Sequence, residues 1–125
     1  MRIISFAWTV APLLAGRKTK TRRDWDYFRA KSFSIGERVL AYDEAPRFGG
    51  EQIAIIKITK KPVQQYTERM TEEDYEAEGF KYMEEQGLLV QGKPPRVFFE
   101  DWRDASEKVW VIEFRVTQTI MGVML

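Results

Sequence analysis

The stretch LLAGRKTKTRRDW, residues 13–25, concentrates positive charge at one short place in an otherwise balanced chain. Five of the seven residues from Arg17 to Arg23 are basic, and Gly16 stands directly before them. The whole chain carries 20 basic and 19 acidic residues, a formal net charge of +1. Electrostatic attraction for a ligand must therefore come from this basic cluster, residues 17–23, and not from the charge of the whole chain.

The composition is that of one globular domain without cysteine or histidine chemistry. Of the 125 residues, 44% are apolar and 14% aromatic, so we expect a single domain over residues 1–125. The lack of cysteine and histidine excludes disulfides, thiolate nucleophiles, histidine bases and zinc sites built from these residues. Acid–base chemistry is left to Asp, Glu, Lys or Tyr, and we expect no metal and no cofactor.

The N-terminal segment MRIISFAWTVAPLLAG, residues 1–16, indicates a buried strand followed by a helical turn, not a signal peptide. It lacks a basic n-region and a small-residue cleavage site, and Pro12 interrupts it. No stretch reaches the ~18 apolar residues of a membrane span. We therefore expect a soluble, cytoplasmic protein without a membrane partner.

Hydrophobic patterns on both sides of the basic cluster predict strands alternating with short helices. Thr9 as N-cap and Gly16 after the last turn delimit a helix that ends where the cluster begins. The clearest helix covers residues 70–87, where Thr71 and Asp74 match a capping box. Strands are predicted over residues 2–8, 35–45, 51–61 and 108–120, and further helical segments over residues 24–31 and 97–106. This order predicts an α+β fold, a small curved sheet or β-barrel with short helices inserted between its strands.

Gly16, Lys18, Thr21 and Arg23 together form the pattern G-x-K-x-x-T-x-R. This pattern resembles the motif of the ASCH domain, a member of the PUA-like superfamily, in which glutamate usually stands in the place of Thr21. The text GRKTKTRR, residues 16–23, is similar to the GRKT-x-T-x-R motif of a branch of small ASCH proteins. The resemblance covers nearly the whole chain, and it implies a PUA-like (ASCH) fold for the single domain.

Members of that branch resemble N4-acetylcytidine amidohydrolases, in which a lysine, a threonine and a downstream glutamate form the catalytic set. The resemblance therefore implies Lys18, Thr21 and Glu78 as catalytic residues, the glutamate being placed by counting from the helix start at Met70. Relative to the smallest members, this chain has extra residues around 46–50 and 88–96. These additions would reshape the mouth of a pocket, and with it the choice of substrate.

The residues themselves admit this chemistry and also a plainer interpretation. Neighbouring cations should lower the pKa of Lys18, and a neutral amine is a nucleophile or a base, although a loop lysine is ordinarily solvated. Lys18 and Thr21 can share a pocket only if the chain bends near residues 18–19, because residues three apart on a strand face opposite sides. At ~100° per residue, Glu78 borders an aromatic stripe, where it would be a general base or a structural ion-pair partner of Arg23 or Lys18.

Four more residues are expected to contact the substrate. Arg17 and Arg23 carry charge that suits a phosphate or a base edge. Trp8 and Trp25 flank the basic cluster, where they could stack a nucleobase or belong to the core. Two functions stay open: an amidohydrolase of N4-acetylcytidine, or a non-catalytic RNA-binding module, with a ribonuclease as its variant, that holds single-stranded RNA or a modified nucleoside in the same basic cleft.

Overall fold

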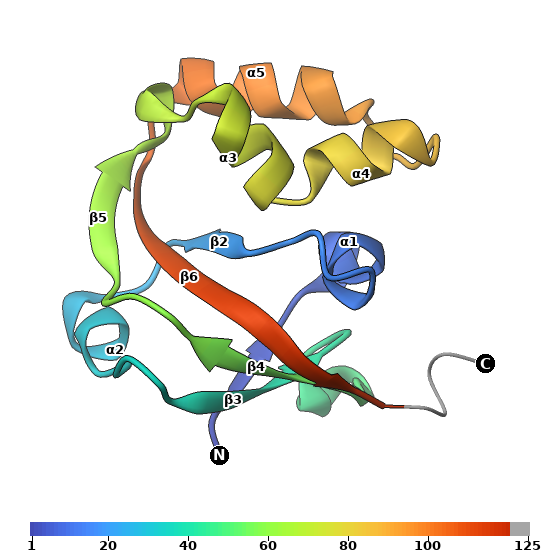
Figure 1. The fold of residues 1–125 in the computed structure, drawn as a ribbon. Helices are drawn as coiled ribbons and strands as arrows, with labels where there is room; N and C mark the ends of the chain where they lie inside the picture. The colour runs from blue at the N-terminus through green and yellow to red at the C-terminus, as the bar shows by residue number, and fades with distance from the viewer. Residues whose placement is uncertain (121–125) are drawn as a thin grey trace.

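The computed structural model describes residues 1–120, and its longest strand, β6 (Lys108–Thr119), organises the fold (Figure 1). The C-terminal half of β6 pairs antiparallel with β4 (Gln52–Ile58), and its N-terminal half pairs antiparallel with both β2 (Lys20–Arg23) and β5 (Val63–Tyr66). β4 pairs in turn with β3 (Arg38–Tyr42), which runs parallel to β1 (Ile3–Ser5). Within the described residues these strands make one six-stranded mixed sheet of order β1-β3-β4-β6-β2, with β5 also on β6, curved into half of a barrel.

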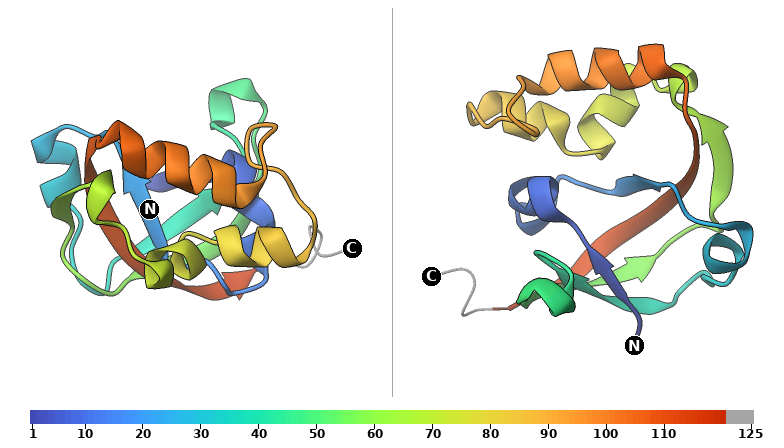
Figure 2. Two further views of the ribbon diagram at one scale, coloured as in Figure 1. Left: turned by 90° about the horizontal axis from the view of Figure 1, so that it is seen from above. Right: turned by 180° about the vertical axis from the view of Figure 1, so that it is seen from behind.

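Short helices fill the connections between the strands. They are η1 (Ala7–Thr9), α1 (Val10–Leu14), α2 (Tyr27–Lys31), η2 (Pro46–Phe48), η3 (Thr67–Arg69), α3 (Glu72–Ala77), α4 (Phe80–Glu85) and α5 (Pro95–Ala105). Figure 2 shows α3, α4 and α5 gathered in one layer on one side of the sheet, with β5 and β6 leading into it. We call these three helices the helical layer.

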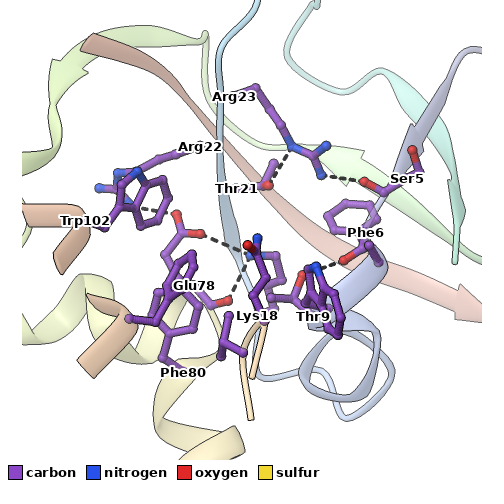
Figure 3. A pocket seen from close by; sticks show the side chains of 15 residues that line it. Ser5, Phe6, Thr9, Lys18, Thr21, Arg22, Arg23, Glu78, Phe80 and Trp102 are labelled. Atoms are coloured by element: carbon purple, nitrogen blue, oxygen red, sulfur yellow. Dashed lines mark hydrogen bonds and ion pairs between the residues drawn. The ribbon is translucent and has the colours of Figure 1, made fainter. Parts of the chain in front are cut away.

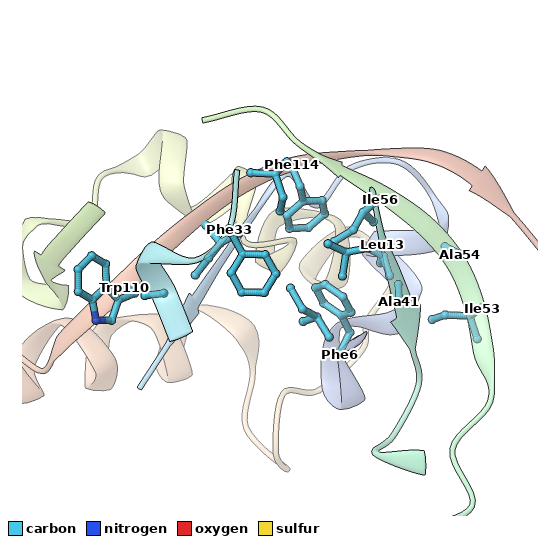
Figure 4. Packing of buried hydrophobic residues seen from close by; sticks show 14 residues of the cluster. Phe6, Leu13, Phe33, Ala41, Ile53, Ala54, Ile56, Trp110 and Phe114 are labelled. Atoms are coloured by element: carbon cyan, nitrogen blue, oxygen red, sulfur yellow. The ribbon is translucent and has the colours of Figure 1, made fainter. Parts of the chain in front are cut away.

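The helical layer and the sheet each have their own apolar cluster among the described residues. In the sheet, Phe6, Leu13 and Phe33 pack with Ile56 and Phe114 (Figure 4). In the helical layer the cluster consists of Met70, Tyr75, Phe80, Met83, Val90 and Phe99. Burying a side chain of this size stabilises the fold by about 1.5–3 kcal/mol, so each cluster holds its own layer together. The charged residues described below lie where the two layers meet.

The structure confirms the α+β order and corrects several element predictions. The helix predicted over residues 70–87 is two helices, because Gly79 adopts a left-handed φ of +96° that no α-helix continues through. The capping box of Thr71 and Asp74 is present. Thr9 does not cap α1; its hydroxyl donates instead to the carbonyl oxygen of Phe6. The strand predicted over residues 2–8 ends at Ser5, since the chain turns into η1.

Two expectations concern the whole chain: a single domain over residues 1–125 and the absence of a membrane span. The last five residues of the predicted domain, 121–125, lie outside the described residues. Within residues 1–120, none of the helices combines the length and the apolar character that crossing a bilayer requires.

Candidate active site between the sheet and the helical layer

Lys18 lies in a short connector between α1 and β2. Gly16 ends α1 with a φ of +75°, and the two amides that follow it both donate to the carbonyl oxygen of Pro12. β2 begins only at Lys20, so Lys18 stands before the strand and does not follow its alternation. The bend that the sequence requires for Lys18 and Thr21 to share a pocket is therefore present.

The Lys18 amine is buried against Glu78, the residue that ends α3. Its Nζ donates to Glu78 Oε1 at 3.2 Å and to the Glu78 backbone carbonyl oxygen at 2.8 Å, and the two side chains are 2% and 3% exposed. The next residue, Gly79, permits this approach because it has no side chain. A Cβ there would lie 2.6 Å from the Pro12 ring and 3.4 Å from Lys18 Cβ.

The side chains of β2 alternate between two surroundings. Thr21 and Arg23 share one face, where Arg23 Nε donates to Thr21 Oγ1 at 2.9 Å and Arg23 Nη2 donates to the carbonyl oxygen of Ser5 at 2.7 Å. Lys20 and Arg22 share the other face, which turns toward α3. A strand of four residues thus supplies both a cavity wall and an anchor for the helical layer.

Asp74 of α3 and Glu78, which directly follows α3, pair with the cations of that second face. Arg22 Nη1 donates to Glu78 Oε2 at 2.6 Å, and its Nη2 lies 3.1 Å from Asp74 Oδ1, to which Lys20 Nζ also donates at 2.9 Å. Burial by itself would raise the pKa of Asp74. The hydrogen bonds from Lys20 and the Thr71 amide, together with the charge of Arg22, outweigh burial and hold that pKa at about 2.

A cavity of about 250 Å³ opens between β2 and the helical layer (Figure 3). Lys18, Thr21, Arg23 and Glu78 all line it. Much of the remaining lining is aromatic and comes from Phe6, Trp8, Phe80, Phe98 and Trp102. The cavity therefore combines a charged and hydroxyl-bearing surface with flat apolar surfaces, the combination that small-molecule sites use.

Two predicted substrate contacts, Arg17 and Trp25, do not line this cavity. Arg17 turns outward to Glu76 of α3 and Glu85 of α4, at 2.7 and 3.0 Å, and these two carboxylates raise its pKa. Trp25 stacks on Phe33, with ring centroids 5.2 Å apart, at the edge of the sheet's apolar cluster. Both residues lie at or beside the motif in sequence, but Arg17 forms ion pairs outside the cavity and Trp25 packs on Phe33.

Burial shifts the acidity of two of the three cations that line the cavity, Lys18 and Arg23. Desolvation lowers the pKa of Lys18, and the nearby charges of Arg23 and Arg22 add to this, while Glu78 opposes it. Desolvation also lowers the pKa of Arg23 to about 10, so this guanidinium stays charged near neutral pH. The cavity thus holds a permanent cation next to an amine that loses its proton more readily than an exposed lysine.

The sequence did not single out Arg22 or, apart from Trp8, the aromatic residues that line the cavity. The alternation of side chains along β2 places Arg22 on the face opposite Thr21, and this follows from the sequence. The two carboxylate partners of Arg22 do not, because they depend on how α3 packs. Phe98 and Trp102 fall in the helical segment predicted over residues 97–106; both pack in the helical layer and also line the cavity. Within residues 1–120, acidic side chains do not gather in threes in a way that would hold a metal ion.

Comparison with solved structures shows that the fold of this chain is similar to known folds. An ASCH domain from Lactobacillus crispatus JV V101 is 14% identical and superposes with a TM-score of 0.54, covering 94% of this chain and 80% of that one. Protein EF3133 from Enterococcus faecalis V583, described as a DUF984 protein, is 18% identical with a TM-score of 0.54, covering 88% of this chain and 70% of that one. No protein-family model matches the sequence, and a search of the curated proteins found no match. The chain has an ASCH-like α+β fold, as the motif implied.

Proposed function

We propose that this cavity hydrolyses the amide of an N-acylated nucleobase, with N4-acetylcytidine as the reference substrate. The observation that carries the proposal is a buried Lys18 amine of lowered pKa in one cavity with the Thr21 hydroxyl and the Glu78 carboxylate. Amide hydrolysis needs a nucleophile, a base that activates it and a group that orients the base. In a chain without histidine or cysteine, Thr21, Lys18 and Glu78 can fill these three roles.

Thr21 is the nucleophile in this proposal, and Lys18 is its base. The Arg23 guanidinium donates to Thr21 Oγ1 at 2.9 Å, so it stabilises negative charge that develops on that oxygen. Because Arg23 is only a donor, it leaves the hydroxyl proton for the neutral Lys18 amine. Thr21 Oγ bonds to the acyl carbon while Lys18 takes this proton, and the carbonyl carbon becomes tetrahedral.

Lys18 then acts as the acid and later again as the base. When the C–N bond of the tetrahedral intermediate breaks, the Lys18 ammonium returns its proton to the leaving exocyclic amine. Water next attacks the acyl-threonine, again losing a proton to Lys18, and the hydroxyl of Thr21 is restored as the carboxylic acid leaves. Glu78 accepts a hydrogen bond from Lys18 throughout and stabilises it while it carries the proton. The net reaction consumes one amide and one water.

The charges around the cavity favour a free nucleoside over a strand of RNA. Arg17, Lys18, Lys20 and Arg22 each pair with a carboxylate of the helical layer. Beyond the basic cluster, Lys93 and Arg96 pair with Asp101 and Glu72. A phosphate backbone is held by a row of cations that are free to exchange their counterions. The basic cluster is largely neutralised by its own chain, which weakens the RNA-binding alternative.

The size and the lining of the cavity point in the same direction. Its volume of about 250 Å³ lies just below the ~300–1,000 Å³ usual for small-molecule sites, so it suits one base with a small acyl group. Trp8 is 57% exposed and also lines the cavity, a position from which its ring could cover a bound base. Stacking on an aromatic side chain contributes ~1–3 kcal/mol per base.

Turnover of N4-acetylcytidine tests the proposal. Purified protein is incubated with the nucleoside, and cytidine and acetate are quantified by chromatography. We expect catalytic turnover by the wild type and a loss of ~10²–10⁴-fold in Lys18→Met, the range for removing a catalytic proton-transfer group. Thr21→Val removes the nucleophile, so its loss should be at least as large. Lys60→Met serves as the matched control, since Lys60 is 70% exposed. Absence of cytidine, or equal rates in wild type and Lys18→Met, would overturn the proposal.

A binding measurement separates the alternative. Fluorescence anisotropy with a labelled single-stranded RNA, at two salt concentrations, should show only weak binding at physiological salt. Tight binding that falls steeply with salt, in a protein that releases no cytidine, would favour the RNA-binding module instead.

A further inference from the structure

Both oxygens of the Glu78 carboxylate are held, each by a different cation. Lys18 Nζ donates to Oε1 at 3.2 Å, and Arg22 Nη1 donates to Oε2 at 2.6 Å (Figure 3). The Arg22 side chain is 1% exposed, so this second contact lies in the interior and is not screened by solvent. Arg22 also lines the cavity, but it is absent from the motif formed by residues 16, 18, 21 and 23.

Arg22 is itself anchored from three directions. Its Nη2 donates to Gln65 Oε1 of β5 at 2.9 Å and lies 3.1 Å from Asp74 Oδ1. Asp74 is fixed in turn, because it is the capping-box residue of α3 and accepts from the Thr71 amide. The guanidinium is therefore a rigid fork between β5 and α3, and it meets the carboxylate of Glu78 in one orientation.

Because Arg22 is anchored, it also affects the position of Lys18 through Glu78. A glutamate has three rotatable bonds, and with Lys18 as its only partner Glu78 could adopt other rotamers and take the amine with it. The charged groups that face Lys18 are Glu78 from α3 and Arg22 and Arg23 from β2. Of these, Arg22 both orients Glu78 and adds positive charge that disfavours the ammonium form of Lys18.

We infer that Arg22 is a positioning residue, which holds Glu78 so that Lys18 faces Thr21 as a neutral base, and which acts through Glu78 instead of on the substrate. The inference rests on the proposed function for its kinetic part. Its structural part, control of Lys18 by Arg22, holds independently of the substrate.

The kinetic test uses Arg22→Met, which removes the fork and keeps an apolar side chain of similar length, and Arg22→Lys, which keeps a charge without the fork. With N4-acetylcytidine we expect kcat to fall roughly 10- to 100-fold in Arg22→Met, the size of one charge-assisted hydrogen bond, with KM nearly unchanged and Arg22→Lys intermediate. Arg2→Met is the matched control, because Arg2 also forks onto a carboxylate, that of Glu37, away from the cavity.

A double-substitution cycle distinguishes positioning from an independent role. If Arg22 acts through Glu78, then Arg22→Met adds little further loss in a Glu78→Gln background. Two losses that multiply fully, or a rise in KM alone, would overturn the inference. Gln65→Met, which removes only one anchor of Arg22, should give a smaller loss of kcat and covers the case in which Arg22→Met does not fold.

A titration of Lys18 by NMR separates this inference from the proposed function. The ¹³Cε signal of Lys18 is followed with pH in lysine-labelled protein and assigned by its disappearance in Lys18→Met. We expect a higher Lys18 pKa in Arg22→Met than in the wild type, and no change in Arg2→Met. If the wild type releases no cytidine, the proposed function fails, and the titration alone then tests whether Arg22 controls Lys18. An unchanged Lys18 pKa in folded Arg22→Met would overturn the inference.

Discussion

The Lys18 side chain is 2% exposed, and burial of this kind disfavours the charged form of a lysine. The Glu78 carboxylate beside it has the opposite effect, because it stabilises that charge. Desolvation lowers the pKa of Lys18 and Glu78 raises it, so the balance of these two effects sets the pH at which the neutral amine forms. A structural ion pair would need no cavity next to it, whereas this one lines a cavity together with a hydroxyl. At the residue scale, this cavity supports the proposal that Lys18 is a base, in addition to its place in a buried ion pair.

The sign of this tuning gives a prediction for Glu78→Gln. If Lys18 is the base of the proposed reaction, wild-type activity should rise with pH as Lys18 loses its proton, because the neutral amine is then the active form. Glu78 raises the Lys18 pKa, so its neutralisation should move the acid limb of kcat/KM to lower pH while kcat itself falls. Arg22→Met should move the limb the opposite way. A pH profile of both variants checks this, and a shift of Glu78→Gln toward higher pH would contradict it.

Among the elements, the junction of α3 and α4 decides whether Lys18 and Glu78 meet. Gly79 has a φ of +96°, and its missing Cβ leaves room for Pro12 and Lys18. The capping box and the aromatic stripe predicted one helix over residues 70–87, since a helical period says nothing about a single left-handed residue.

Substituting Gly79 tests that junction. In Gly79→Ala, the left-handed backbone costs about 1–2 kcal/mol for an L-residue, and the clash with Pro12 at 2.6 Å adds to it. We expect a larger fall in the free energy of unfolding, by urea denaturation, than in Gly87→Ala. Gly87 has a φ of +68° but no atom within 4 Å of an added Cβ, so it isolates the backbone cost. Equal losses in the two variants would show that Gly79 is not needed for close packing.

What the sequence predicts well is local, and what it misses depends on packing between elements. The capping box of Thr71 and the glycine after α1 follow from neighbouring residues and are present. The bend before β2, which a pocket shared by Lys18 and Thr21 requires, is present as well. Arg17 and Trp25 neighbour the motif as closely as Arg23 does, but only the fold determines which side chain enters the cavity. Likewise, the carboxylate partners of Arg22 come from a helix more than 50 residues further along the chain.

For the molecule as a whole, the cluster of Lys18, Lys20, Arg22, Asp74 and Glu78 joins the sheet to the helical layer. Each layer has its own apolar cluster, so these buried ion pairs are a main connection between them. The candidate active site lies at this connection. Acid that weakens the pairs should therefore weaken the contact between the layers and the site together.

Asp74 makes this dependence measurable. Its pKa of about 2 lies below the ordinary 3.8, so its contribution to stability is present above pH 3.8 and is lost as pH falls through about 2. This shift corresponds to about 2 kcal/mol. Asp74→Asn should lower the free energy of unfolding by about that amount at neutral pH, with a difference that shrinks below pH 3.8.

Urea denaturation at several pH values measures this difference. Asp101→Asn is the control, since the exposed pair of Asp101 with Lys93 should contribute no more than about 0.5 kcal/mol. A difference between wild type and Asp74→Asn that stays constant down to the lowest pH would refute the role given to Asp74.

The most direct test of the central claim, that Lys18 activates Thr21 for attack on an amide, is the mass of the enzyme during turnover. Protein mixed with N4-acetylcytidine is quenched in acid within its first turnover, digested and analysed by mass spectrometry. The account predicts one acetyl group on Thr21 that appears together with cytidine, and its loss in Thr21→Val and Lys18→Met. Release of cytidine at the wild-type rate by Thr21→Val, with no acetylated peptide, would contradict it.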